Sequence, residues 1–328
     1  IMKTVNNCIF PFARAQTISA APVSAQNHKP VDIKPIDPSY FIPKRHEGRT
    51  YLITGGARGI GAASAIRLAR EGANVVILDV LAKEGAETVA QIRTEGGKAD
   101  FVKGDVRSNT DVQKAVDLAM AKFGELNGAL NAAGVMAATA PDAPFDFQKQ
   151  KSLFPSPIAE ASDEYFDTLM DINATGVFKS MRAELRPMLK QGKGGAIVNI
   201  CSIAGLTGLA GNSAYVASKH ACSGLTRNGA IDYAPYGIRI NSVNMAATET
   251  AMTAMATEFV KAANKENAGS ETVNMGRIKT QSILAFADSN HRQATVWEQA
   301  AVISFLLSDE ASNLTGGLYA TDGGWTAY

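Results

Sequence analysis

The alternation of strand-like and helix-like segments constrains the fold of this chain more than any other feature of its sequence. From Arg49 onward, short apolar runs are separated by longer runs whose apolar residues recur at helical spacing. Repeated strand–helix–strand units with short connections predict a parallel sheet covered by helices on both faces, with right-handed crossovers. The expected strands are Thr50–Thr54, Asn74–Asp79, Ala99–Lys103, Gly128–Asn131, Ala196–Ile200, Ile238–Val243 and Leu318–Ala320. The expected helices are Ile60–Glu71, Lys83–Glu95, Thr110–Phe123, Asp163–Lys190, a helix from Ala214, another from Thr250, and Trp297–Leu307.

This pattern divides the chain into an arm and one large α/β domain. Residues 47–328 are interpreted as a single doubly wound, Rossmann-type domain with about seven parallel strands. Residues 1–46 contain six prolines and no periodicity, so we expect an extended arm packed on the body or on a neighbouring subunit. The first acidic residue is Asp32, and residues 1–31 therefore resemble an organelle-targeting segment in charge. The prolines argue against such a segment, and we expect a cytoplasmic protein.

Charge and cysteine content exclude several classes of function. The 328 residues include 32 lysines and arginines against 31 aspartates and glutamates, so no global field favours nucleic acid or an anionic membrane. No apolar run approaches the length of a membrane span. The three cysteines lack metal-ligand spacing and are odd in number, which predicts a reducing compartment, no disulfide framework and no metal site.

A glycine-rich turn joins the first expected strand to the first expected helix. The stretch Thr54–Gly61 has the spacing G-x-x-x-G-x-G. Glycines allow a tight turn and a close approach of the backbone to a pyrophosphate, which then binds at the helix N-terminus. Such a motif alone is weak, but its place after the first strand favours a dinucleotide site. The expected contacts in this turn are Gly55, Arg58, Gly59, Ile60 and Gly61.

An acidic residue at the end of the second strand bears on the identity of the cofactor. Asp79 lies eighteen positions after Gly61. A carboxylate there accepts hydrogen bonds from the ribose hydroxyls and repels a 2′-phosphate, which favours NAD. Arg58 favours NADP instead, because a guanidinium in the glycine turn can bind a phosphate. We give Asp79 more weight, and NADP stays open as the alternative.

The stretch from Cys201 to Lys219 contains a plausible proton-transfer site. Tyr215 and Lys219 are four residues apart on an expected helix, so their side chains share one face. An ammonium next to a phenol favours the phenolate, which is the form that acts as a base. Ser202 lies thirteen positions earlier, at the end of a strand, where its hydroxyl can meet the same substrate oxygen. Alone, a Tyr-x-x-x-Lys pair is more often an exposed helix face.

Further short motifs follow in order along the chain. They are Thr54–Gly61, Asp105-Val106, Asn131-Ala-Ala-Gly134, Asn173-Ala-Thr-Gly176, Ser202, Tyr215-x-x-x-Lys219 and Thr321-Asp-Gly-Gly324. On these motifs, the chain from about residue 48 to 325 resembles the short-chain dehydrogenase/reductase family in its common single-domain form. The resemblance implies a homotetramer and a small-molecule substrate.

The resemblance also implies roles for individual residues. Asp105 and Val106 would hold the adenine, and Asn131, Ala132 and Gly134 would line the cofactor groove. Thr248 and Thr250 would contact the nicotinamide carboxamide. The residues Asn173, Ser202, Tyr215 and Lys219 would form the catalytic tetrad, with Tyr215 as the general acid and base, and Tyr215 and Lys219 would also contact the cofactor.

Three functions are compatible with this pattern. The first is an NAD-dependent oxidoreductase that interconverts a secondary alcohol and a ketone, acting on a bulky apolar molecule. The second is an NADPH-dependent ketone reductase, which Arg58 favours. The third is a non-catalytic NAD-binding scaffold, which the unusual Met245 and Ala246 favour, because they stand where the family has Pro and Gly. The intact tetrad argues against the third.

Two insertions distinguish this chain within the resemblance. Residues 138–158 contain Phe145, Phe147 and Phe154, and residues 278–295 precede Trp297. Long extra loops are usually functional or disordered. We expect both to lie near the carboxyl edge of the sheet and to build a roomy apolar pocket; a subunit contact is the alternative. The other expected pocket residues are Met252, Met255, Phe259, Leu284 and Phe286.

Overall fold

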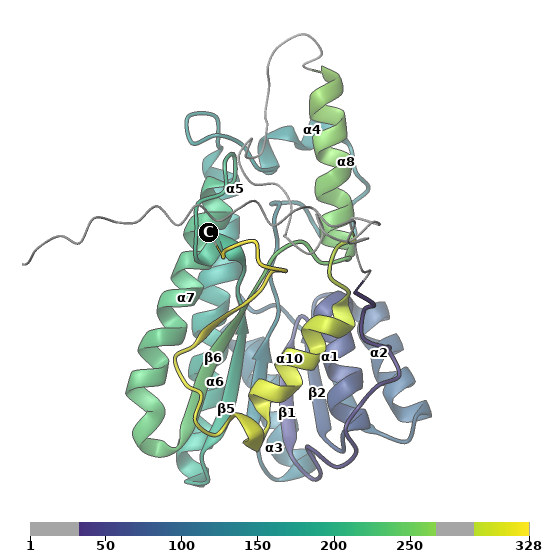
Figure 1. The fold of residues 1–328 in the computed structure, drawn as a ribbon, viewed down its shortest axis with the longest axis vertical. Helices are drawn as coiled ribbons and strands as arrows, with labels where there is room; N and C mark the ends of the chain where they lie inside the picture. Colours follow the sequence, from purple (N-terminus) through teal and green to yellow (C-terminus); the bar gives the residue numbers. More distant parts are fainter. Residues whose placement is uncertain (1–32, 267–291, 328) are drawn as a thin grey trace, which may run out of the picture.

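The computed structural model describes residues 33–266 and 292–327 of the chain (Figure 1). Within these residues a single sheet of seven parallel strands forms the centre, in the order β3-β2-β1-β4-β5-β6-β7. The chain starts near the middle and winds outward first in one direction and then in the other, so the expected doubly wound, Rossmann-type fold is confirmed. The strands are β1 (Thr50–Thr54), β2 (Asn74–Asp79), β3 (Lys98–Lys103), β4 (Gly128–Asn131), β5 (Gly195–Ile200), β6 (Ile238–Met245) and β7 (Leu318–Thr321).

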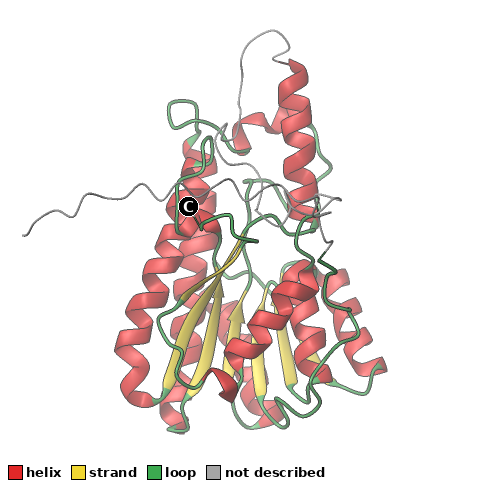
Figure 2. Cartoon of the chain, viewed as in Figure 1, coloured by secondary structure: helices red, strands yellow, loops and turns green. Residues whose placement is uncertain are grey.

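Helices cover both faces of the sheet (Figure 2). One face packs against α1, α2 and α10, and the other against α3, α6 and α7. The chain passes over the sheet between successive parallel strands, and each crossover helix buries its apolar side against the sheet. The helices are α1 (Gly59–Arg70), α2 (Ala82–Thr94), α3 (Asn109–Phe123), α4 (Phe147–Gln150), α5 (Asp163–Met170), α6 (Gly176–Gln191), α7 (Ser213–Tyr233), α8 (Ala251–Glu266) and α10 (Val296–Leu307).

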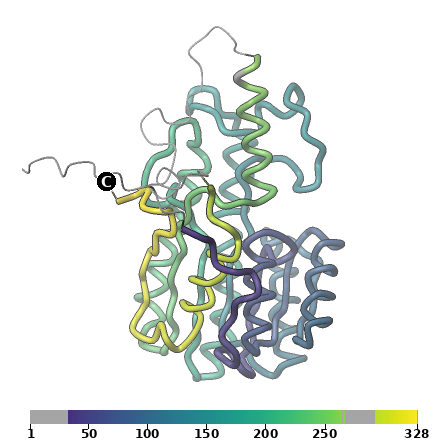
Figure 3. The backbone as a smooth tube through the Cα atoms, turned by 45° about the vertical axis from the view of Figure 1, so that its right-hand side comes forward, coloured from purple at the N-terminus to yellow at the C-terminus, as the bar shows by residue number. Residues whose placement is uncertain are grey.

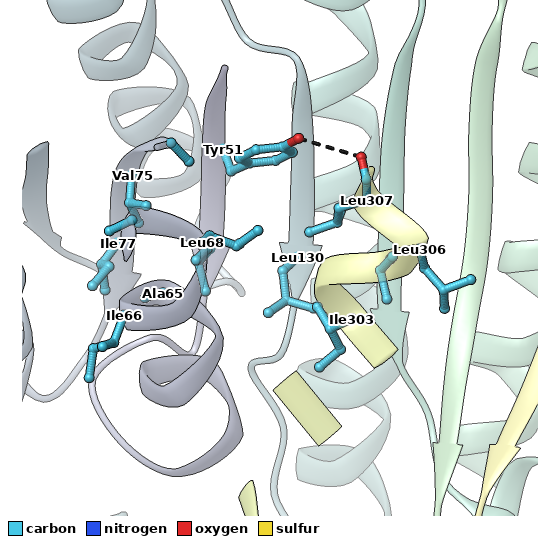
Figure 4. Packing of buried hydrophobic residues seen from close by; sticks show 14 of the residues in the cluster. Tyr51, Ala65, Ile66, Leu68, Val75, Ile77, Leu130, Ile303, Leu306 and Leu307 are labelled. Carbon is cyan, nitrogen blue, oxygen red and sulfur yellow. Dashed lines mark hydrogen bonds between the residues drawn. The ribbon is translucent and has the colours of Figure 1, made fainter. Parts of the chain in front are cut away.

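Strand β1 shows how the pleat divides the core between the two faces. Tyr51 and Ile53 pack with the α1 and α10 side, whereas Leu52 between them packs with the opposite side. Figure 4 shows the first of these clusters, in which Leu68 of α1 and Ile303 of α10 lie over the sheet. All five residues of β1 are buried, as expected for a strand covered on both faces.

The structure refines two of the expected elements. The helix predicted over Asp163–Lys190 is interrupted by a π-helical turn at Asp171–Thr175, which separates α5 from α6. Strand β6 continues to Met245, beyond the predicted end at Val243, and pairs there with Thr321 of β7. A proline at 245 would have had no N–H for a strand ladder, so the methionine permits this extension.

The described part of the N-terminal arm lies on the body of the same chain. Its backbone at Ile42 donates to Glu71 Oε1 at 3.1 Å, and Arg45 forms an ion pair with Glu310 at 3.2 Å. His46 is fully buried and bonds Tyr51 Oη at 2.8 Å and Ser304 Oγ at 3.0 Å. Figure 3 shows this purple segment running beside α10. Residues 1–32, which include the targeting-like segment, lie outside the described residues.

The first insertion packs against α8 above the carboxyl edge of the sheet. It contains α4 and a short 3₁₀ turn at Lys151–Leu153, and Figure 1 shows α4 beside the upper half of α8. Most of the second insertion, including Leu284 and Phe286, lies outside the described residues. In the part of the chain that is described, none of the helices combines the length and hydrophobicity that a membrane span requires.

Candidate active site

The glycine turn after β1 forms a cradle that side chains would fill. Gly55 and Gly59 have φ values of 70° and 60°, in the left-handed region that favours glycine. A Cβ at Gly55 would lie 2.5 Å from the backbone nitrogen of Ala133, and one at Gly61 would lie 2.0 Å from the carbonyl of Gly55. Among the described residues, the N-cap Arg58 makes no capping hydrogen bond to α1 with its side chain. The turn therefore leaves backbone N–H groups for an anionic group such as a pyrophosphate.

Asp79 is fixed at the end of β2, where it lines the same cavity. Its Oδ2 accepts from the backbone N–H of Ala57 and its Oδ1 from that of Leu81, both at 3.0 Å. Each carboxylate oxygen has a second lone pair, so the group can still accept a ribose hydroxyl. Arg58 also lines the cavity, but its guanidinium donates to the carbonyl of Pro141 at 3.2 Å. This cation therefore contacts the first insertion.

The other expected cofactor residues fall into two groups. Asp105, Val106, Ala132 and Gly134 line the cavity, and the Asp105 carboxylate is paired with Arg107 at 2.6 Å. Burial raises the pKa of Asp105, but the bonds from Arg107 outweigh it and the net pKa is lowered.

Asn131 forms the second group, because its side chain is absent from the cavity wall. The Nδ2 of Asn131 donates to Glu184 Oε2 at 3.2 Å and to Asn199 Oδ1 at 3.0 Å. Asn199 in turn donates to Thr226 at 2.9 Å. The Asn131 side chain thus belongs to a buried polar network at the end of β4, and its contact with the cofactor stays a prediction.

Ser202, Tyr215 and Lys219 line the same cavity. Only 6%, 8% and 5% of their surfaces are exposed. Lys219 Nζ lies 5.7 Å from the centre of the Tyr215 ring and donates to the carbonyl of Ile200 at 2.9 Å. Burial lowers the pKa of Lys219, but the neighbouring Tyr215, Cys222 and Cys201 outweigh it and raise the pKa. The ammonium next to the phenol is therefore retained.

Ser202 follows β5 and is held by its surroundings. Its Oγ accepts from the backbone N–H of Ala204 at 3.2 Å and donates to the carbonyl of Met245 at 3.4 Å. The Asn244 amide donates to the Ser202 carbonyl at 2.9 Å. The hydroxyl is thus oriented by the ends of two adjacent strands.

Asn173 lies in the π-helical turn and connects three elements. Its Oδ1 accepts from the N–H of Val135 at 2.8 Å, and its Nδ2 donates to the Val135 carbonyl at 2.9 Å and to Ser218 Oγ at 3.1 Å. A Cβ at Gly134 would lie 3.1 Å from Asn173 Oδ1 and 3.4 Å from Lys219 Nζ. Asn173 is fully buried and absent from the cavity wall. It therefore positions the loop after β4 and the helix that carries Lys219.

The segment after β6 supplies the remaining predicted contacts. Met245, Ala246, Thr248 and Thr250 all line the cavity. Thr248 is buried, and its Oγ1 accepts from Gln299 at 3.3 Å. The structure thus brings both expected carboxamide contacts to the end of the sheet where Ser202 lies.

Apolar side chains make up most of the cavity surface. The whole cavity measures about 1130 Å³. Met252 and Met255 line it as expected, whereas Phe259 packs instead on Phe154, with ring centres 4.4 Å apart. Sequence reasoning did not single out Val135, Met136, Ile203, Leu209 and Trp297, which also line the cavity.

The first insertion therefore contributes to the cavity in two ways. Its beginning, residues 138–141, lines the cavity directly, whereas Phe147 and Phe154 form a separate apolar cluster with Phe259. The insertion holds α8, which carries Met252 and Met255 into the wall. Among the described residues, no cluster of histidine, cysteine, aspartate or glutamate could hold a metal ion.

Comparisons with known proteins find relatives over most of the chain. A sequence model of the family described as short chain dehydrogenase matches residues 49–261. The chain is 38% identical over 290 residues to the 3beta-hydroxysteroid dehydrogenase of Mediterraneibacter gnavus, covering 88% of this chain and 98% of that protein. It is 35% identical over 287 residues to the cyclohexanol dehydrogenase of an Acinetobacter species, with coverages of 88% and 98%. A crystal structure of a short chain dehydrogenase from Mycobacterium paratuberculosis bound to NAD superposes with a TM-score of 0.73, at 28% identity, covering 87% of this chain and all of that chain.

Proposed function

Because the chain belongs to the short chain dehydrogenase family, and is therefore an oxidoreductase acting on hydroxyl groups, we propose that it interconverts alicyclic secondary alcohols and their ketones with NAD. The observation that carries this proposal is the single cavity that joins the glycine cradle and Asp79 to Ser202, Tyr215 and Lys219. One end suits a dinucleotide, and the other places a proton-transfer group against an apolar wall.

The tetrad residues have distinct tasks in the proposed reaction. Tyr215 takes the hydroxyl proton when the alcohol is oxidised and returns it when the ketone is reduced. Ser202 donates its hydroxyl to the substrate oxygen, and the charged Lys219 lies beside the Tyr215 ring, where it attracts negative charge that develops on the reacting oxygens. Asn173 acts through its neighbours, because it holds the loop at Val135 and the helix at Ser218. The bound nicotinamide would supply the hydride acceptor.

The cradle fits the cofactor on structural grounds, and Asp79 favours NAD over NADP. Its carboxylate is fixed by two backbone N–H groups at the end of β2, where the ribose of a dinucleotide would lie. Arg58, which favoured NADP in the sequence, donates to Pro141. An NADPH-dependent reductase is therefore the weaker alternative.

The alicyclic substrate class is supported by the shape of the cavity and by the relatives. The cavity lining includes the apolar side chains of Met136, Leu209, Met252 and Met255, next to a few polar ones such as Glu164 and Thr168. Such a wall favours a compact apolar ring over a charged or strongly hydrated molecule. The relatives act on ring alcohols according to their names, which are 3beta-hydroxysteroid, cyclohexanol and cyclopentanol dehydrogenases.

A substrate screen tests the proposal. Cyclohexanol, cyclopentanol and a 3β-hydroxysteroid are compared with the open-chain alcohol 2-propanol, each with NAD and with NADP, by the absorbance of the reduced nicotinamide. We expect higher kcat/KM for the ring alcohols, and for NAD. Equal or better turnover of 2-propanol would contradict the substrate class.

Two variants test the roles of individual residues. Tyr215→Phe should lower kcat by about 10²–10⁴-fold while cofactor binding is kept, because it removes only the ionisable oxygen. Unchanged turnover in this variant would refute the catalytic assignment and favour a scaffold. Asp79→Ser should lower the preference for NAD over NADP by about tenfold or more, which corresponds to about 1.4 kcal/mol. A preference that stays the same would show that another group selects the cofactor.

A further inference from the structure

Two thiols meet directly behind the catalytic serine. Cys201 immediately precedes Ser202, and Cys222 lies on α7, three residues after Lys219. Their sulfur atoms are 2.7 Å apart, and both cysteines are free. The proposed reaction uses neither of them, although Cys201 lines the cavity.

We propose that Cys201 and Cys222 form an oxidation site, at which a hydroperoxide converts the two thiols to a disulfide and thereby lowers turnover. The formation of the disulfide is independent of the proposed function, and only the effect on turnover rests on it. The site is suited to a small oxidant, because Cys201 is 1% exposed and Cys222 is completely buried, so that Cys201 is reached only from the cavity.

The two thiols differ in a way that assigns their roles. Burial raises the pKa of Cys201, but its hydrogen bond with Cys222 and the nearby Lys219 ammonium outweigh this and lower it. The hydrogen bond with Cys201 and burial raise the pKa of Cys222. Cys201 is therefore the thiol that ionises more readily, and it is also the one at the cavity wall. Thiolates are the forms that react with peroxides, so Cys201 is the attacking group and Cys222 the resolving group.

The chemistry balances without any further reactant. The Cys201 thiolate attacks one peroxide oxygen, the O–O bond breaks, and the second oxygen leaves as hydroxide and becomes water by taking a proton. Cys201 is now a sulfenic acid. The sulfur of Cys222 then attacks the sulfur of Cys201, the S–O bond breaks, and a second water leaves. Two thiols have lost two electrons, and hydrogen peroxide has become two molecules of water.

Disulfide formation would shift the groups that perform the reaction. A disulfide bond measures about 2.05 Å, so the sulfur atoms must approach by about 0.7 Å from their present separation. Cys201 is held by its backbone bond to Val243 at 2.9 Å, and Lys219 by its bond to Ile200 at 2.9 Å. The strain therefore falls on Ser202, which is adjacent to Cys201, and on Lys219, which lies within one helical turn of Cys222. Displacements of about 1 Å in an active site can cost about 10²-fold in rate, and we expect a loss of at least about tenfold.

The experiment treats the full chain with hydrogen peroxide and reads peptides and activity in parallel. Trypsin cleaves after Lys193, Lys219 and Arg227, so the two cysteines fall on separate peptides, 194–219 and 220–227. We expect a linked pair of these peptides in the oxidised protein, a fall in turnover, and recovery of both thiols and turnover with dithiothreitol. Cys8→Ser, which removes the third cysteine, is the matched control and should behave like the parent.

The variant Cys222→Ala separates disulfide formation from other oxidation. Without a resolving thiol, Cys201 should pass to the sulfinic acid, and dithiothreitol should no longer restore turnover. Absence of the linked peptides in oxidised parent protein would overturn the proposal, as would linked peptides with unchanged turnover. A parent protein that oxidises none of the alcohols would refute the proposed function instead, while the peptide readout would still decide whether the disulfide forms.

Discussion

The carboxyl group of Glu184 should make the stability of this protein depend on pH. Glu184 is fully buried on α6, and its Oε2 accepts one bond from Asn131. Its Oε1 has no hydrogen-bond partner within the part of the chain that the structure describes. Burial raises the pKa of this carboxyl to about 8 from an ordinary value of 4.5, and the bond from Asn131 only partly opposes the effect. The group is therefore neutral in the folded protein at neutral pH.

The sign of the effect follows from where the proton is bound. Between pH 4.5 and 8 the folded protein keeps the proton on Glu184 and the unfolded chain releases it. The free energy of unfolding therefore falls as the pH rises through this interval. At about 1.36 kcal/mol per pH unit, the full interval corresponds to a loss of about 5 kcal/mol. This is a large share of the stability of a typical domain.

The variant Glu184→Gln removes this pH dependence while it keeps the shape of the side chain. The difference in unfolding free energy between this variant and the parent should therefore grow in favour of the variant as the pH rises from 4.5 to 8, by about 5 kcal/mol. Guanidinium unfolding at both ends of the interval measures the difference. Glu87→Gln is the control, because the side chain of Glu87 is 64% exposed. If the unfolding free energies of the Glu184→Gln variant and the parent changed equally with pH, the proton on Glu184 would not be the cause of the pH dependence.

Two further predictions concern packing and acid stability. Phe259→Ala should release α8 from the insertion, at a cost of about 3–5 kcal/mol, and lower kcat/KM for ring alcohols more than for 2-propanol. Phe178→Ala, which removes an exposed ring on α6, is the control. Equal losses for both substrates would contradict the role of α8. His46 is desolvated and lies near Arg45 and Arg49, which lowers its pKa from 6.5 to about 3, so stability should fall as the pH drops from 6.5 to 3. His46→Gln should flatten that part of the curve, and a slope that persists in the variant would point to another group.

The fold was largely predictable because strand and helix periods differ clearly in this sequence. The strands Thr50–Thr54, Asn74–Asp79 and Gly128–Asn131 were predicted with the bounds that the structure has. The π-helical turn was not predictable from periodicity, since one extra residue in a turn leaves the apolar stripe of α5 and α6 nearly unchanged.

Prediction of the site was strongest for residues fixed by local geometry. The sequence predicts that Tyr215 and Lys219 lie on one face of one helix. It also predicts the glycine turn, in which a positive φ and close backbone contacts require glycine. The direction of the Asn131 side chain could not, because it depends on Glu184, which is distant in sequence and buried under the same strand end. Phe259 was misplaced for a similar reason: its partner, Phe154, lies in an insertion whose path no local rule gives.

The segment after Met245 and Ala246, which replace the Pro and Gly of the family pattern, makes a contact that the sequence could not suggest. The segment after β6 is held by Ala294, whose N–H donates to the Ala247 carbonyl at 3.2 Å and whose carbonyl accepts from the N–H of Glu249 at 2.9 Å. Ala294 lies near the end of the second insertion. A proline would fix φ at position 245, whereas the Ala294 bonds hold the backbone two to four residues later, at Ala247 and Glu249. Backbone bonds thus hold the segment that follows Met245 and Ala246, and this segment gives no support to a non-catalytic scaffold.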